Sequence, residues 1–198
     1  MIPGPHVELE RPTRMTLAEY LRFEETSEGR HEYVDGLVNP VSGGTLAYIR
    51  VKGHLGVELD RHLRGGPCEV LGGDFRLTVP GRNQYRYPDA SVFQGPVETA
   101  PEEAQAYSGL NPVAAFEVLQ AKSEADDRGP KLRFYERIAS LCLVVHAHSE
   151  RPEVEWFERS GSGTWERERV EGLDATADWP SIGVQLPLRD LYRDMAFG

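Results

Sequence analysis

The sequence predicts an α/β fold in which helices flank a mixed β-sheet. Apolar residues recur at helical spacing between Leu46 and Leu63, whereas the stretches NPVAAFEVLQ and LCLVVHAH are apolar on both faces, as in the central strands of a covered sheet. Helical and strand-like segments also alternate along the chain, which is typical of helices packed on a sheet. A length of 198 residues suits one domain with peripheral additions.

The N-terminal part predicts an irregular tail, a helix and a hairpin. Residues 1–14 hold three prolines among polar side chains and form the expected tail. Thr16, with Glu19 three residues later, has the spacing of a capping box and should begin a short helix. The pair Asp35-Gly36 lies between apolar residues and predicts a hairpin turn, so Glu32 is expected on the first strand or just before the turn.

The middle of the chain predicts a long helix followed by strands. The helix should span 46–63, because Gly65-Gly66-Pro67 ends it. Strand-like patterns follow in CEVLGGDFRLTV, with a break at Gly72-Gly73, and in YRYPDASVF. The polar turn PGRNQ joins these two stretches.

The C-terminal part predicts a helix, a buried strand and a hairpin. Pro130 fits the first turn of a helix that runs to about Ile138. LCLVVHAH is then a second buried strand, and the alternating stretches EVEWFER and TWERERV, separated by SGSG, predict an additional antiparallel hairpin near the C-terminus. PLRDLYRD is expected to form a short helix. We therefore expect a single domain over 15–198.

Charge limits the classes of function. The chain has 22 Lys and Arg against 32 Asp and Glu, a formal net charge of −10. This argues against wholesale adhesion to nucleic acid, which depends on basic residues that neutralise phosphates. A nucleic-acid function would need a local basic patch, and Arg50 to Arg86, with seven basic and four acidic residues, is the most basic region. The candidate phosphate contacts are Arg76, Arg82, Arg86 and Lys122, although ordinary solvated positions explain them equally well.

Compartment signals are few. The N-terminus has no basic region followed by an apolar stretch, and no apolar run approaches the ~20 residues that span a bilayer. Cys68 and Cys142 lack zinc-type spacing, and two thiols do not make a disulfide framework. We expect a soluble cytoplasmic protein without a membrane partner.

Two carboxylates point to chemistry. Glu117 lies within an apolar strand, where an ionised group needs a partner, a metal ion or a proton; a hydrogen bond to an arginine such as Arg128 is an equally simple explanation. Asp89 follows a proline, as in many turns, yet it begins a strand 117 − 89 = 28 residues before Glu117. Adjacent strands would place both side by side, and such a pair suits Mg²⁺.

Four stretches together resemble the PD-(D/E)XK nuclease superfamily, and specifically its Uma-type restriction endonuclease family. They are MTLAEYLRFEE, HEYVDGLV, VLGGDFRLTVPGRNQYRYPDASVF and FEVLQAKSEADDRGPKLRFYERI. The resemblance implies a restriction-endonuclease-like fold. Many such nucleases carry a lysine two residues after the acid, where Leu119 stands in this chain. In the Uma-type family the lysine has moved to the following helix, which matches Lys131.

The resemblance also implies roles for these residues. Asp89 and Glu117 would hold Mg²⁺ or Mn²⁺, and the Val118 carbonyl is a further candidate ligand. Lys131 would orient or help deprotonate the attacking water. Glu32 matches an acidic family position and would bind the metal directly or through water, with a solvated strand-end acid as the alternative.

Other positions match the family less closely. Lys122 is a rival lysine that the family pattern disfavours. Asp127 and Tyr135 also match family positions, and we interpret them as a helix N-terminal residue and a packing residue. The chain departs from the family at Gln120, around Tyr48 where a histidine is usual, and in the strand SLCLVVH.

These observations predict a Mg²⁺-dependent endonuclease that acts on DNA. Homodimerisation is expected by analogy with restriction enzymes that cut both strands. The main alternative is a catalytically inactive nuclease fold that serves as a binding or regulatory module, which the acidic charge favours. A small-molecule hydrolase on the same scaffold is a third reading.

Overall fold

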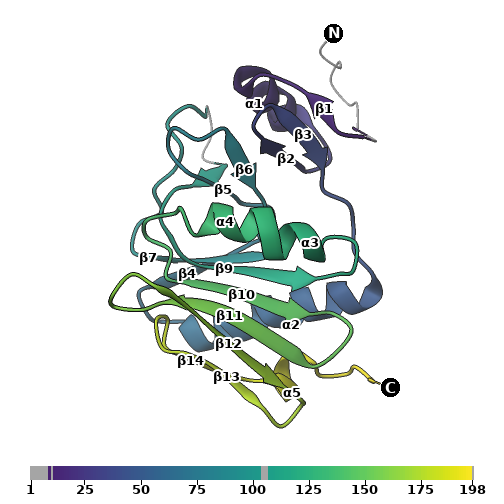
Figure 1. The fold of residues 1–198 in the computed structure, drawn as a ribbon, viewed down its shortest axis with the longest axis vertical. Coiled ribbons are helices and arrows are strands. Elements are labelled where there is room, and N and C mark those ends of the chain that lie inside the picture. Colours follow the sequence, from purple (N-terminus) through teal and green to yellow (C-terminus); the bar gives the residue numbers. More distant parts are fainter. Residues whose placement is uncertain (1–8, 10, 104–106, 198) are drawn as a thin grey trace.

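The computed structural model describes residues 9, 11–103 and 107–197 and contains one large mixed sheet with helices on both faces (Figure 1). The strand order of this main sheet is β12-β11-β10-β9-β7-β4. Only β9 and β10 run parallel, and the other neighbours are antiparallel. The strands are β4 (Cys68–Gly72), β7 (Ala90–Gln94), β9 (Pro112–Leu119), β10 (Leu143–His148), β11 (Glu153–Arg159) and β12 (Trp165–Glu171).

A second sheet of six short strands lies at the N-terminal end of the molecule (Figure 1). Its order is β1-β3-β2-β6-β5-β8, and α1 (Leu17–Thr26) packs against it through Tyr20 and Phe23. The strands are β1 (Thr13–Arg14), β2 (His31–Val34), β3 (Leu37–Pro40), β5 (Arg76–Thr78), β6 (Gln84–Arg86) and β8 (Ser108–Gly109).

Two helical elements cover the main sheet. The helix α2 (Leu46–Leu63) packs on one face through Val51, Leu55 and Leu59. On the other face lies a continuous helical segment formed by α3 (Glu124–Asp126), a π-helical turn (Asp127–Lys131) and α4 (Leu132–Tyr135). We call it the 124–135 helix. The α2 side is completed by a hairpin of β13 (Thr176–Trp179) and β14 (Val184–Pro187), followed by α5 (Leu188–Leu191).

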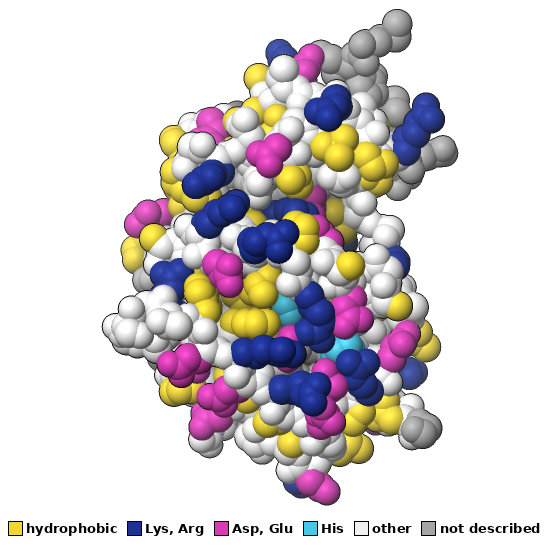
Figure 2. All heavy atoms as spheres, viewed as in Figure 1, with side chains coloured by type: hydrophobic (Ala, Val, Ile, Leu, Met, Phe, Trp, Pro, Cys, Tyr) yellow, Lys and Arg dark blue, Asp and Glu magenta, His cyan; other side chains and the backbone are white. Residues whose placement is uncertain are grey.

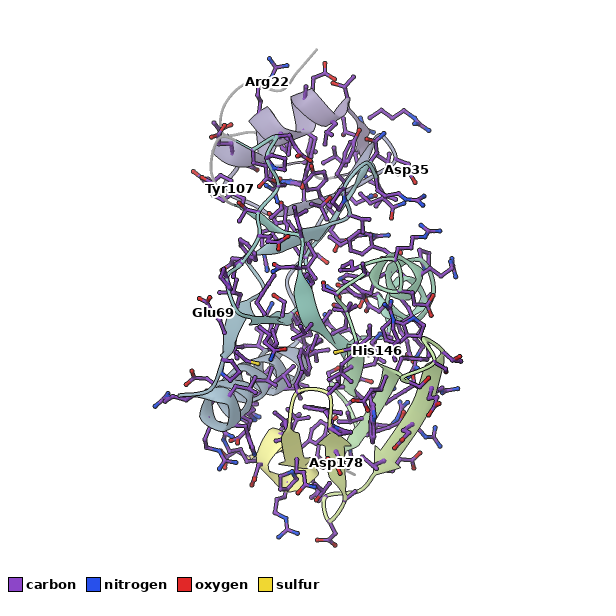
Figure 3. All side chains as sticks on the ribbon, turned by 90° about the vertical axis from the view of Figure 1, so that its left-hand side faces the viewer. Arg22, Asp35, Glu69, Tyr107, His146 and Asp178 are labelled. Carbon is purple, nitrogen blue, oxygen red and sulfur yellow. The ribbon has the colours of Figure 1, made fainter. Side chains whose placement is uncertain are left out.

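Local sequence signals explain several of these elements. Thr16 and Glu19 form both bonds of the capping box at the start of α1. Asp35 and Gly36 have φ values of 48° and 91° and form the tight turn between β2 and β3; Asp35 lies at the exposed tip of this hairpin (Figure 3). The α/β fold with its mixed sheet is confirmed, and the predicted hairpin of EVEWFER and TWERERV forms β11 and β12. The hairpin of β13 and β14 was not predicted.

Some expectations need correction. Pro130 lies inside the helix that begins at Glu124, not in its first turn. The stretch CEVLGGDFRLTV supplies β4 to the main sheet and β5 to the second sheet, because the chain crosses between them after Gly72. Residues 13–14 of the expected tail form β1 beside β3, whereas residues 1–8 and 10 lie outside the described part. No helix in the described ranges has the length and apolar character of a membrane span.

Candidate functional site

Asp89 and Glu117 come together because β7 and β9 are antiparallel neighbours. Ala90 pairs with Phe116, so Asp89 lies opposite Glu117 and on the same side of the sheet. The Asp89 N–H donates to the Phe116 carbonyl (2.8 Å), and Asp89 Oδ2 accepts a hydrogen bond from the Val118 N–H (2.7 Å). The strand register thus places two carboxylates side by side at the end of β9.

Lys131 reaches this pair from the 124–135 helix. Its Nζ lies 2.8 Å from Glu117 Oε1, 3.3 Å from Glu32 Oε1 and 3.7 Å from Asp127 Oδ1. It also donates to the Tyr87 carbonyl at 2.9 Å. Lys131 is buried. Its contacts with Glu117, Glu32 and the Tyr87 carbonyl are within hydrogen-bond distance and match the three donors of a lysine, whereas Asp127 is a longer ion pair.

Glu32, on β2, pairs with Arg86 as well as with Lys131. Its Oε2 accepts a hydrogen bond from Arg86 Nη1 (2.7 Å), which also donates to Asp126 Oδ2 (2.9 Å), and its Oε1 accepts one from the Tyr87 N–H (3.0 Å). Among the residues that the structure describes, no three His, Cys, Asp or Glu side chains form a group suited to a metal ion. In this structure Glu32 neutralises Arg86 and Lys131, and its binding to a metal ion, directly or through water, stays a prediction.

The electrostatics of the site favour an additional positive charge. Burial raises the pKa of the Glu117 carboxyl well above its usual range; Lys131 opposes this shift, and Asp127 and Asp89 add to it. Burial alone would raise the pKa of Glu32, but Lys131 and Arg86 lower it. Burial alone would lower the pKa of Lys131, but Glu117 and Glu32 raise it well above its usual value. Its neighbours thus favour the charged forms of Lys131 and Glu32, whereas burial works against the charged form of Glu117, which a further cation would stabilise.

These groups line a pocket of about 500 Å³ between the two sheets, the N-terminal part of α2 and the 124–135 helix. Asp89, Glu117, Glu32 and Lys131 all contribute to its wall. Mg²⁺ commonly binds one or two carboxylates and keeps water or phosphate oxygens as its other ligands. The pair Asp89 and Glu117 in an open pocket matches that donor set.

The predicted phosphate contacts separate into three kinds. The prediction that Arg76 contacts phosphate needs correction. Arg76 is 2% exposed, because its guanidinium is bound inside the second sheet. Arg82 is exposed in the turn after β5 and does not line the pocket. Arg86 lines the pocket but is held by acids, and Lys122 lines the pocket while donating to Ser42 Oγ at 2.9 Å.

Figure 2 shows no broad basic area on the face in view, because Lys and Arg side chains alternate there with Asp and Glu.

His146, labelled in Figure 3, is fully buried in β10 beside Glu117 in the sheet register. Neither of its ring nitrogens has a hydrogen-bond partner among the described residues.

Other contributors were not assigned from sequence. Tyr48, noted only as a departure from the family, donates a short hydrogen bond to Asp89 Oδ1, and Lys52 Nζ lies 2.9 Å from the same oxygen. The two residues are one turn apart in α2, a spacing that could have drawn attention to them. Tyr135 was interpreted as packing but donates a short hydrogen bond to Glu117.

The alternative that paired Glu117 with an arginine is wrong. Arg128 instead bonds to Glu124 and Glu155, while Glu117 takes its positive partner from Lys131. Asp127, interpreted as a helix N-terminal residue, lies within the π-helical turn and contacts Lys131.

Comparisons with known proteins bear on the whole chain. Residues 17–189 match the Uma2 family model, described as "Putative restriction endonuclease". The uncharacterized protein slr1290 of Synechocystis sp. is 28% identical over 184 residues, covering 93% of this chain and 94% of that protein. The uncharacterized protein sll1609 of the same organism is 25% identical over 172 residues, covering 86% and 95%.

A solved structure shares the fold. The crystal structure of a protein from Anabaena variabilis, described as a putative nuclease, superimposes with a TM-score of 0.71 at 18% sequence identity. The match covers 89% of this chain and 97% of that one. The likeness extends over nearly the full length of both proteins.

Proposed function

Because the chain belongs to the Uma2 restriction endonuclease family, we propose that it is a metal-dependent nuclease that hydrolyses phosphodiester bonds in DNA. The observation that carries the proposal is the meeting of Asp89, Glu117 and Lys131 in one pocket, with Lys131 Nζ 2.8 Å from Glu117 Oε1. Three side chains from two strands and a helix converge there, as phosphoryl chemistry requires.

In this proposal Asp89 and Glu117 hold one Mg²⁺, for which Mn²⁺ substitutes. When bound, the cation supplies Lewis-acid polarisation of the phosphate and a lower pKa for a coordinated water. Lys131 orients the attacking water and stabilises negative charge on the pentavalent phosphorus. Tyr135 and Val118 fix the two carboxylates through their hydrogen bonds to Glu117 and Asp89.

The proposal also covers the contacts with DNA, the domain organisation and the oligomeric state. Lys122, at the exposed rim of the pocket, is the proposed contact with the DNA backbone, joined by Arg86 if it exchanges an acidic partner for phosphate. Arg82 contributes from the neighbouring turn. We further propose that residues 15–198 form one domain and that the protein acts as a cytoplasmic homodimer, so that both DNA strands are cut.

Cleavage of supercoiled plasmid tests the proposal. The parent protein should nick plasmid in Mn²⁺ or Mg²⁺ but not in EDTA. Glu117→Gln, Asp89→Asn and Lys131→Met should each lose on the order of a hundredfold or more in rate, because each removes a charge from the reacting centre.

The matched control is Glu166→Gln, an exposed acid on β12 outside the pocket, which should cleave at the parental rate. Circular dichroism verifies that every variant is folded. Parental activity in folded Asp89→Asn would refute the proposed site.

A second candidate function is supported by a specific observation. Each acid is already neutralised within the protein, Glu32 by Arg86, Glu117 by Lys131 and Asp89 by Lys52. Such pairing also suits an inactive nuclease fold that binds DNA without cutting it. A gel-shift titration with and without Mn²⁺ separates the two, since binding without cleavage in any divalent cation would favour the binding module.

A further inference from the structure

Lys52 is a second lysine at the candidate metal site. It lies on α2, a different element from the 124–135 helix that carries Lys131, and its Nζ is 2.9 Å from Asp89 Oδ1. It follows Tyr48 by one helical turn and lies 5.7 Å from the centre of that ring. The two α2 side chains therefore reach the same carboxylate oxygen.

In this arrangement both carboxylate oxygens of Asp89 already have partners. Oδ1 accepts from Tyr48 and faces Lys52, while Oδ2 accepts from the Val118 N–H. Each carboxylate oxygen can accept two partners, so a cation that binds Asp89 through Oδ1, the oxygen with two partners, must replace Tyr48 or Lys52 there. The Val118 bond belongs to the backbone at the end of β9, and Tyr48 is neutral, so Lys52 is the partner whose positive charge the cation duplicates.

Lys52 is also the easiest cation to move. The Lys131 side chain is 8% exposed and that of Arg86 is 5% exposed, and each is bound by more than one acid. Pulling either away would leave a buried charge without a partner. The Lys52 side chain is 25% exposed and has one acidic partner, Asp89, among the described residues, so its ammonium can turn into water at small cost.

A glycine makes room for this ammonium. At Gly73, which follows β4, a Cβ atom would collide with Lys52 Nζ and would lie 3.1 Å from Lys52 Cε and 3.2 Å from the Pro88 carbonyl oxygen. At the preceding Gly72 a Cβ would meet nothing within 4 Å. The missing side chain at Gly73 therefore leaves the space that the Lys52 ammonium occupies next to Asp89, whereas Gly72 has no part in it.

We propose that Lys52 is a tethered counter-ion that occupies the cation position at Asp89 and is displaced when a divalent cation binds. Lys52 is thus a positioning residue that sets the metal affinity of the site, distinct from the role proposed for Lys131. This inference rests on the proposed metal site, but it concerns how tightly that site binds and not whether it cleaves.

Calorimetric titration with Mn²⁺ alone tests the inference without measuring activity. Lys52→Gln should bind Mn²⁺ more tightly than the parent, on the order of fivefold. Arg50→Gln removes the same charge from an exposed position of the same helix and should leave the affinity unchanged. In plasmid cleavage, Lys52→Gln should reach half-maximal rate at a correspondingly lower Mn²⁺ concentration. Lys52→Arg keeps the positive charge and should need the same Mn²⁺ concentration as the parent.

A second pair of variants keeps the charge of Lys52 and changes the space around its ammonium. Gly73→Ala should push the ammonium away from Asp89 and raise the Mn²⁺ affinity, whereas Gly72→Ala should not. Equal Mn²⁺ affinity in the parent and Lys52→Gln, with cleavage intact, would overturn the inference and leave the nuclease standing. An effect of Lys52→Gln without one of Gly73→Ala would overturn displacement. Failure of every protein to bind Mn²⁺ would overturn the inference and the metal site together.

Discussion

Arg76 is a basic residue built into the interior of the second sheet. Its guanidinium carbon lies 5.4 to 5.9 Å from the ring centres of four tyrosines. Nη1 donates to Tyr20 Oη at 2.9 Å, and Nη2 pairs with Glu103 at 2.8 Å. The side chains of both members of the ion pair are at most 3% exposed. Arg76 therefore stabilises the fold and is shielded from any nucleic acid.

Replacing Arg76 should lower the free energy of unfolding of the protein. Arg76→Ala leaves Glu103 as a buried carboxylate without its partner, a loss that typically costs about 3–5 kcal/mol. Urea denaturation measures it, with exposed Arg82→Ala as the control that should change the free energy of unfolding by less than about 0.5 kcal/mol. Unchanged stability in Arg76→Ala together with weakened DNA binding would show that this residue is a phosphate contact after all.

Single residues differ in how far sequence could predict them. Glu117 was predictable because an acid inside an apolar strand is rare. Asp89 resembled an ordinary turn residue by itself and was predictable only because adjacent strands would bring it beside Glu117. Lys131 followed only from the resemblance to a family. Lys52 and Tyr48 were not assigned, since their role depends on where α2 crosses the end of β7, which no local pattern encodes.

At the scale of elements, the 124–135 helix departs most from expectation. Proline has no N–H, and its ring clashes with the carbonyl four residues earlier, so it usually begins a helix. Here Pro130 lies within a π-helical turn, whose wider hydrogen-bond ring accommodates the residue. The same turn contains Asp127 and Lys131, so the irregular geometry lies at the candidate site.

Glu155 ties this helix to the main sheet. It is buried on β11 and bonds to Arg128 from the helix and to Arg167 from β12. Burial alone would raise its pKa, but the neighbouring His146, Arg167 and Arg128 lower it to about 2. Its folded-state pKa thus lies below the ordinary value of 4.5.

This shift predicts part of the acid sensitivity of the protein. A depressed carboxylate pKa contributes stability that is complete above pH ~4.5 and is lost as the pH falls toward ~2. The contribution is on the order of 3 kcal/mol, at about 1.4 kcal/mol for each pKa unit. Glu155→Gln should therefore lose less stability than the parent between pH 5 and pH 3 in urea titrations.

Exposed Glu166→Gln should follow the parental curve in the same titrations. If Glu155→Gln also retained the full parental pH dependence, the ion pairs of Glu155 would not contribute to stability in this range.

At the scale of the whole molecule, the candidate site lies where two sheets meet. The main sheet supplies Asp89 and Glu117, the second sheet supplies Glu32 and Arg86, and the helices supply Lys52 and Lys131. The order of long helices and apolar strands predicted the main layers. The second sheet was harder to predict, because its strands have only two to four residues and pair segments distant in the chain.

The acidic surface agrees with a site that recognises phosphate locally. With a net charge of −10 and mixed charges on the face in Figure 2, long-range attraction would contribute little to the proposed binding of DNA. Affinity would instead come from the pocket and its bound cation.

The most direct measurement of the central claim is an anomalous diffraction map from crystals soaked in Mn²⁺. We predict one anomalous peak between the carboxylates of Asp89 and Glu117, with Lys131 still beside Glu117 and the Lys52 ammonium turned away from Asp89. A folded protein that shows no peak there at millimolar Mn²⁺, or a peak bound elsewhere with both carboxylates still paired to their lysines, would contradict the account.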